Sequence, residues 1–172
     1  MRTDEVRQRR TKTPEQALTA LMRLCARAEK STGDARRLMR GWGVDPHAQE
    51  EVLRKLIEQR FIDDVRFAEA FVREKTNLSG WGAYKIRTAL ARKGIDRATA
   101  ERALAAVDPA QNDERLRQQL ARKMRSVRAA TTYELKTKLM RYGLSLGFDY
   151  ESVGDAVNAM IKNRDEEECD IF

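Results

Sequence analysis

The chain has 172 residues and a net charge of +7 at pH 7; 35% of its residues are charged and 41% are hydrophobic. No segment reaches the ~18 consecutive apolar residues that a membrane span needs, so we expect no membrane-spanning helix. Three prolines and the absence of Asn-Gly or Asp-Gly turns argue against a β-rich fold, whereas abundant Ala, Leu, Arg and Glu favour helix throughout.

The N-terminal residues and the cysteines indicate a cellular compartment. The first twelve residues are charged and lack the apolar core of a signal peptide. Cys25 falls in an apolar helical segment and Cys169 in an acidic one, so we expect no disulfide between them. Both observations favour the reducing cytoplasm.

Helix start signals recur along the chain. The first lies at residues 13–16, where Thr-Pro-Glu-Gln combines an N-cap, a proline at the first helical position and a glutamine that completes a capping box. Ser31 is the predicted cap of a second helix, and Asp45, followed by proline, begins a third. Further starts are predicted at Asp63, Gly82, Asp96, Thr131 and Asp149.

Three of these helices share one spacing pattern. Twelve residues after the cap comes a glycine followed by an aliphatic residue, and apolar residues stand four positions before each glycine. Positions four apart lie on one face of a helix, and glycine ends helices because it adopts the left-handed conformation at little cost. The glycines predicted to end these helices are Gly43, Gly94 and Gly143.

The repeat predicts an all-α fold of three tandem three-helix units that stack into an elongated, curved array, wound to the right or to the left. A unit of about fifty residues has a marginal core alone, which favours stacking on its neighbours. The alternative is one nine-helix globule in which the repeat is only ancestral. The predicted divisions are a basic N-terminal extension at 1–13, units at 14–62, 63–110 and 111–164, and an acidic tail at 165–172.

One long, ordered motif resembles a known family. Its parts are 61–64 (Phe-Ile-Asp-Asp), 67–68 (Phe-Ala), 80–86 (Gly-Trp-Gly-Ala-Tyr-Lys-Ile), Leu90 and 93–95 (Lys-Gly-Ile). Together they resemble the central signature of RecX proteins. Ala17 and Leu18, followed by residues 31–44, resemble the first repeat of that family, so the resemblance spans about 14–164.

The resemblance implies a function as well as a fold. It implies a cytoplasmic, non-enzymatic protein that binds the RecA filament on DNA and restrains its ATPase, recombinase and coprotease activities, with a place in DNA repair and the SOS response. We expect a monomer; capping of filament ends and coating of the filament groove both stay open. The chain departs from the family at 77–79 (Asn-Leu-Ser) and Ala83, where basic residues and a proline are frequent, which weakens a phosphate contact there.

No catalytic, cofactor or metal site is predicted. His47 is the only histidine and neither cysteine has a nearby ligand partner, so neither a zinc site nor a Ser-His-Asp triad can be assembled. Asp63 and Asp64 are interpreted as a cap and a first-turn carboxylate. Residues 80–85 lack the Gly-Lys-Ser/Thr ending of a phosphate loop, so we interpret them as a helix start with Gly82 as N-cap.

Basic residues are concentrated in one region. Residues 111–148 carry nine Lys and Arg against three Asp and Glu, whereas 149–172 carry two against eight. A solvated face is the simpler interpretation of any single cation, but the regional excess predicts a positive surface that meets phosphates or acidic patches of RecA. Trp81 is a candidate aromatic anchor. The candidate partner- or DNA-binding cations are Lys85, Arg92, Lys93, Arg122, Lys123, Arg125, Arg128, Lys136, Lys138 and Arg141.

A second functional class stays open, in which one three-helix unit binds DNA directly as a helix-turn-helix does. Recognition helices of that class usually offer Asn, Gln, Arg or Ser to the bases. The middle helices here offer mostly Lys, Arg and Ala, which hold phosphates but distinguish sequences poorly. Binding to naked and to RecA-coated DNA separates the two classes, and nucleotide turnover by the protein alone tests for a third, an enzyme.

Overall fold

The computed structural model describes the backbone of residues 11–169 and the side chains of residues 11–163. In this part of the chain there are nine α-helices and no strand, which confirms the all-α prediction. None of these helices is long and apolar enough to cross a membrane. Most of the predicted extension and the side chains of the predicted tail lie outside the described residues. The helices are α1 (Pro14–Cys25), α2 (Thr32–Gly41), α3 (Pro46–Glu58), α4 (Asp64–Asn77), α5 (Ala83–Arg92), α6 (Arg97–Ala105), α7 (Pro109–Ser126), α8 (Thr132–Ser145) and α9 (Tyr150–Cys169).

The helix starts follow the predicted caps at every helix except α7, whose cap, Asp108, was not predicted. Thr13 and Gln16 form a complete capping box at α1, with backbone-to-side-chain hydrogen bonds of 3.3 and 3.1 Å. At α8 only half of the box forms: the Thr131 hydroxyl accepts from the Glu134 N–H, but the Glu134 carboxylate accepts from the N–H of Ala130. Each arrangement satisfies amides that have no partner within the helix.

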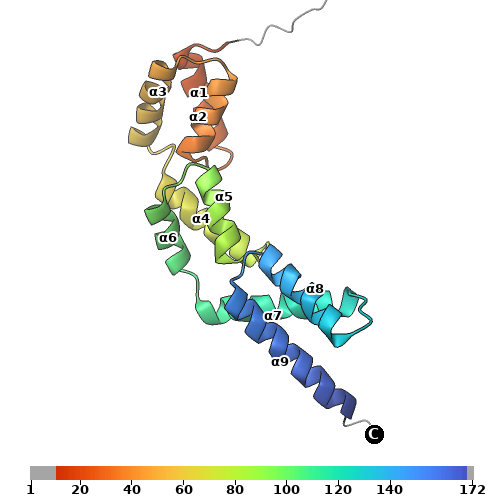
Figure 1. Cartoon of the computed structure of the whole chain (residues 1–172). Helices are drawn as coiled ribbons and strands as arrows, with labels where there is room; N and C mark the ends of the chain where they lie inside the picture. Colours follow the sequence, from red (N-terminus) through yellow and green to blue (C-terminus); the bar gives the residue numbers. More distant parts are fainter. Residues whose placement is uncertain (1–10, 170–172) are drawn as a thin grey trace, which may run out of the picture.

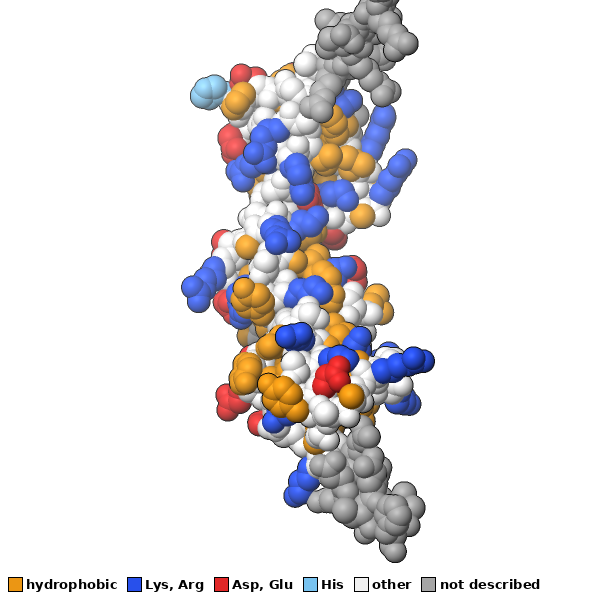
Figure 2. Space-filling view, turned by 45° about the vertical axis from the view of Figure 1, so that its right-hand side comes forward, with side chains coloured by type: hydrophobic (Ala, Val, Ile, Leu, Met, Phe, Trp, Pro, Cys, Tyr) orange, Lys and Arg blue, Asp and Glu red, His pale blue; other side chains and the backbone are white. Residues whose placement is uncertain are grey.

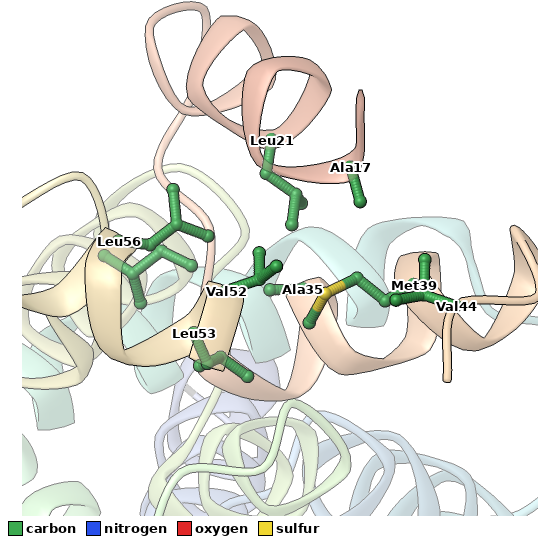
Figure 3. Packing of buried hydrophobic residues seen from close by; sticks show 9 residues of the cluster. Ala17, Leu21, Ala35, Met39, Val44, Val52, Leu53 and Leu56 are labelled. Carbon is green, nitrogen blue, oxygen red and sulfur yellow. The ribbon is translucent and has the colours of Figure 1, made fainter. Parts of the chain in front are cut away.

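Each consecutive trio of helices surrounds its own hydrophobic core. We call α1–α3, α4–α6 and α7–α9 the first, second and third units. The helix pairs in most extensive contact all lie within one unit. In the first core, Leu21 of α1, Met39 of α2 and Leu56 of α3 are fully buried and gather between the helices (Figure 3).

The three units follow one another along an elongated, curved body (Figure 1). This arrangement confirms the predicted array and replaces the alternative of a single globule. Separate cores explain the shape, because each unit buries its own apolar faces and meets its neighbour over a small contact.

Glycines in the left-handed conformation end the three middle helices. Their φ angles are +67° at Gly43, +79° at Gly94 and +90° at Gly147, and the residue after each is buried. The prediction that Gly143 ends the third of these helices is wrong. α8 continues through Ser145, and Gly147 has the terminating role.

Gly143 instead makes room for a neighbouring helix. A Cβ atom at this position would lie 2.6 Å from Cγ1 of Val153, a fully buried residue of α9. At the positions equivalent by distance from the terminating glycine, the second unit has Leu90 and Ala100. In the second unit the larger side chain of the pair belongs to the middle helix, and in the third unit it belongs to the last helix. The core is filled in both.

The middle helices meet end to end at two joints. At the first joint, between α2 and α5, a Cβ at Gly33 would lie 2.2 Å from the carbonyl oxygen of Lys93, and the Ser31 hydroxyl donates to that oxygen at 2.7 Å. At the second joint, between α5 and α8, a Cβ at Gly82 would lie 2.4 Å from the carbonyl oxygen of Gly147. Helix starts expose N–H groups and helix ends expose carbonyls. At the second joint these groups pair directly, because the N–H of Tyr84 donates to the carbonyl oxygen of Gly147.

Candidate docking surface

Two adjoining hollows lie on the surface at the second joint and the third unit beside it. The first has a volume of about 270 Å³ and is lined by α5 and the end of α8; the second has a volume of about 430 Å³ and is lined by α7 and α8. Ser145 lines both. We call the two together the junction groove. It contains six of the eleven predicted binding residues: Trp81, Lys85, Arg92, Lys123, Lys138 and Arg141.

The first hollow combines cations with an exposed aromatic ring. Lys85 lies with its Nζ 4.6 Å from the centroid of the Trp81 ring and donates to the carbonyl oxygen of Ser145 at 3.3 Å. Arg92 is exposed, and no hydrogen bond or ion pair ties its side chain to another described residue. Tyr84 is 70% exposed beside them.

Trp81 is less accessible than the sequence suggested. Its ring is partly buried against the second core, and Lys75 also lies over it, with Nζ 5.4 Å from the ring centroid. Tyr84 is therefore the open aromatic of this hollow. Tyr84 belongs to the RecX-like signature, but the sequence indicated no role for it. The signal of its exposure was its place in the first turn after Gly82, two positions before the buried Ile86 and therefore on the opposite side of the helix.

The second hollow is apolar at its floor and basic at its edge. Lys123 lies with its Nζ 5.3 Å from the centroid of the Tyr142 ring, and the Tyr142 hydroxyl donates to Oε1 of Gln119 at 3.2 Å. Among the described residues, neither Lys123 nor Arg141 has a carboxylate partner. These two cations therefore stay available to an anion from outside the chain.

Lys138, in the same hollow, is partly compensated. It donates to the carbonyl oxygen of Arg128 at 2.6 Å and forms an ion pair of 2.5 Å with Glu134. The hydrogen bond from Lys138, assisted by the N–H of Ala130, lowers the pKa of the Glu134 carboxyl. Lys138 thus holds the loop before α8 as well as adding charge to the groove.

The remaining predicted cations lie elsewhere. Lys93 forms an ion pair with Asp34 at 3.0 Å, so it contributes to the first joint rather than to an open surface. Arg122 donates to the carbonyl oxygen of Gln118 in its own helix at 3.4 Å. Exposed positions outside the two hollows are occupied by Arg125, Arg128 and Lys136. The binding role of all these residues stays a prediction.

Figure 2 shows how the charges are distributed over one face of the molecule. Lys and Arg side chains extend along its whole length, interleaved with hydrophobic side chains, and acidic groups are fewer. A surface of this kind attracts polyanions and acidic protein surfaces. The junction groove adds aromatic contact area to that general attraction.

The acidic pair and the cysteine that could suggest a catalytic or metal site make structural contacts instead. Asp63 caps α4 through the N–H groups of Val65 and Arg66, and Asp64 accepts from the N–H and hydroxyl of Thr32. In the described part of the chain, no cluster of three or more His, Cys, Asp or Glu is placed to hold a metal ion. Cys25 packs against the first core, and burial raises the pKa of its thiol. The groove's own side chains offer hydrogen bonds, charge and aromatic surface.

Comparison with known proteins identifies the family. The model of the RecX second three-helix domain matches residues 63–104, and that of the RecX third three-helix domain matches residues 111–157. The chain is similar to "Regulatory protein RecX" of Clostridium botulinum strain Eklund 17B, with 31% identity over 121 residues that cover 69% of this chain and 56% of that protein. "Regulatory protein RecX" of Serratia proteamaculans is 30% identical over 110 residues, 64% of each chain. The chain spans about half the length of the clostridial relatives.

Solved structures support the same fold. A structure described as "Crystal structure of regulatory protein RecX" matches with a TM-score of 0.77 and 23% identity, covering 87% of this chain and 73% of that one. The RecX structure from Lactobacillus salivarius matches with a TM-score of 0.73 and 22% identity, covering 87% and 96%. With three separate helical cores, end-to-end joints and two matched domain models, the chain belongs to the RecX family.

Proposed function

We propose that this chain is a regulator that binds RecA filaments on DNA and inhibits their ATPase, recombinase and coprotease activities. Family membership supports the regulatory role, since the relatives carry the name regulatory protein RecX. The observation that carries the contact site is the junction groove, where unpaired cations of the second and third units flank Tyr84 and Tyr142.

The proposal describes a cytoplasmic, non-enzymatic monomer whose three units act as one docking body. The end-to-end joints support this picture because they fix the spacing between neighbouring units. Unit boundaries at 62/63 and 110/111 belong to the same proposal. Inhibition then follows from bridging or obstructing neighbouring RecA subunits.

A binding experiment tests the groove directly. Biotinylated oligo(dT) is immobilised with and without a RecA coat, and binding of the full chain is followed by biolayer interferometry. Replacing Lys123 and Arg141 with Glu should weaken binding to the coated DNA by about tenfold or more and flatten its salt dependence. Arg23 on α1 and Arg27 in the turn after it provide a charge-matched control, because both are exposed. Equal losses in the two double variants would contradict a specific groove.

Direct DNA binding is the second candidate function. The exposed Tyr84 ring, which lines a hollow together with Lys85 and Arg92, favours it, since bases of single strands stack on such rings. The same experiment separates the candidates. Tighter binding to RecA-coated than to naked oligo(dT) supports the filament regulator, and equal or tighter binding to naked DNA supports the direct DNA-binding protein.

A further inference from the structure

A separate hollow lies on the second unit, away from the residues of the junction groove. It has a volume of about 420 Å³ and forms where α4, α6 and the start of α7 meet. Each of these helices contributes one arginine: Arg73 from α4, Arg102 from α6 and Arg115 from α7. Since these positions are far apart in the sequence, only the fold brings them together.

Two of the three guanidinium groups are held by neutral partners. Arg115 donates to Oδ1 of Asn77 at 2.7 Å and to Oε1 of Gln111 at 3.2 Å, and Arg102 donates to the Thr99 hydroxyl at 3.3 Å. Among the described residues, none of the three forms an ion pair with a carboxylate. Three cations against two carboxylates, Glu69 and Asp108, leave the lining with a net positive charge, which favours an anion among the arginines.

A buried hydroxyl without a partner lies in the same wall. Thr76 is 3% exposed and lines the hollow, and its Oγ1 has no hydrogen-bond partner among the described residues. A buried hydroxyl without a hydrogen bond lowers the stability of the folded chain. A change of its χ1 rotamer exchanges the methyl and the hydroxyl, so Thr76 can present a donor to a bound group.

The rest of the lining selects among anions. Val72 and Val107 provide apolar surface, which suits the aliphatic stem of a side chain. Glu69 and Asp108 also line the hollow, and the Asp108 carboxylate caps α7 through the N–H of Ala110 at 3.0 Å. These two carboxylates repel a chain of phosphates but tolerate one carboxylate surrounded by neutral backbone.

We propose that this hollow binds an Asp or Glu side chain of a partner protein. The carboxylate accepts hydrogen bonds from Arg73, Arg102 and Arg115, for which the planar guanidinium fork is well suited. Its methylene groups rest on Val72 and Val107. The inference is independent of the proposed function, because it concerns a different surface and commits to the chemistry of the bound group.

Fluorescence anisotropy with the full chain tests this site. The probe is a short fluorescein-labelled peptide of alternating Glu and Gly, compared with its Gln analogue, with inorganic phosphate as a competitor and with labelled oligo(dT). We expect the Glu peptide to bind more tightly than the Gln analogue. Arg73→Gln, which removes an exposed side chain without an ion pair, should weaken binding of the Glu peptide by about tenfold.

Matched variants keep the result interpretable. Arg117→Gln is the control, because Arg117 lies on α7, is 62% exposed and pairs with Glu114 outside the hollow. The double variant Lys123→Glu, Arg141→Glu should retain peptide binding, so failure of this site and failure of the junction groove are distinguishable. Unchanged peptide binding in both Arg73→Gln and Arg102→Gln would overturn the proposal. So would loss of oligo(dT) binding, rather than peptide binding, in these two variants.

Discussion

The two joints between units share one geometry but differ in chemistry. In both, a glycine near the start of one middle helix lies against the backbone at the end of the next. The first joint adds side-chain contacts: Asp64 accepts from Thr32 at 2.9 and 2.7 Å, and Lys93 pairs with Asp34 at 3.0 Å. The charged side chains of this joint are therefore already bound to partners, and they hold the two units together.

The second joint depends more on the backbone. The N–H of Gly82 donates to the carbonyl oxygen of Leu146 at 2.8 Å, and the N–H of Tyr84 donates to that of Gly147 at 3.0 Å. Among the described residues, no ion pair links α5 to α8. A joint built mainly from backbone contacts therefore leaves Arg92, Lys123 and Arg141 of the junction groove without carboxylate partners in the described part of the chain, although Lys85 donates to the carbonyl oxygen of Ser145.

The largest effect is expected from a methyl group at the second joint. Gly82→Ala places Cβ 2.4 Å from the carbonyl of Gly147, and because the obstacle is backbone, the two helices must separate. We expect a loss of about 3 kcal/mol in the free energy of unfolding, measured by urea denaturation. Gly154→Ala is the control; nothing lies within 4 Å of its Cβ, so a gain of about 0.5–1 kcal/mol is expected. An unchanged free energy of unfolding in Gly82→Ala would refute the close backbone contact.

A volume exchange tests the difference between the second and third cores. Gly143→Leu should destabilise the chain by about 2 kcal/mol through overpacking against Val153, and Val153→Ala by a similar amount through a cavity. The double variant reproduces the pairing of Leu90 with Ala100 and should be more stable than the sum of the single losses predicts. Strict additivity in a double-mutant cycle would argue against direct packing of the two positions.

Removing a charge contact at the first joint should have a smaller effect. Asp64→Ala leaves the N–H and hydroxyl of Thr32 without their acceptor, which should cost about 1–2 kcal/mol in the free energy of unfolding. Asp113→Ala is a suitable control on α7, since that side chain is exposed. Equal urea midpoints for the two variants would show that Asp64 does not hold the joint.

The smallest effect concerns acid stability within the first two units. Arg36–Glu50 and Arg87–Glu101 form equivalent bridges, and the hydrogen bond from each arginine lowers the pKa of its glutamate below 4.5. Each bridge therefore stabilises the fold above pH 4.5, and this contribution is lost as the pH falls through the lowered pKa. Glu101→Gln should reduce the acid sensitivity of unfolding slightly, because the pair is exposed. A steeper acid loss in the variant, in urea titrations at several pH values, would contradict this assignment.

All caps but Asp108, the repeat and two of the three terminating glycines were predicted, because each depends on local backbone chemistry. Gly143 misled the prediction because it lies twelve residues after Thr131, as Gly43 and Gly94 lie after their caps, yet α8 continues for another turn. Only the packing against Val153 reveals what Gly143 does.

The candidate site was predictable in part. The excess of cations in one region pointed to the junction groove, but the sequence gave no sign that Lys93 is held by Asp34 or that Tyr84 is the open aromatic. Arg73, Arg102 and Arg115 come from three helices, and no sequence pattern joins them. Contacts between distant segments are settled by the fold rather than by periodicity.

The central claim is that the second and third units present a basic groove that docks on RecA filaments. ATP hydrolysis by RecA on single-stranded DNA, with this chain added at substoichiometric amounts, tests it most directly. We predict inhibition by the natural chain and by the control with Glu at positions 23 and 27, and loss of inhibition when Lys123 and Arg141 are replaced with Glu. Undiminished inhibition by that groove variant, with its helical fold intact by circular dichroism, would contradict the claim.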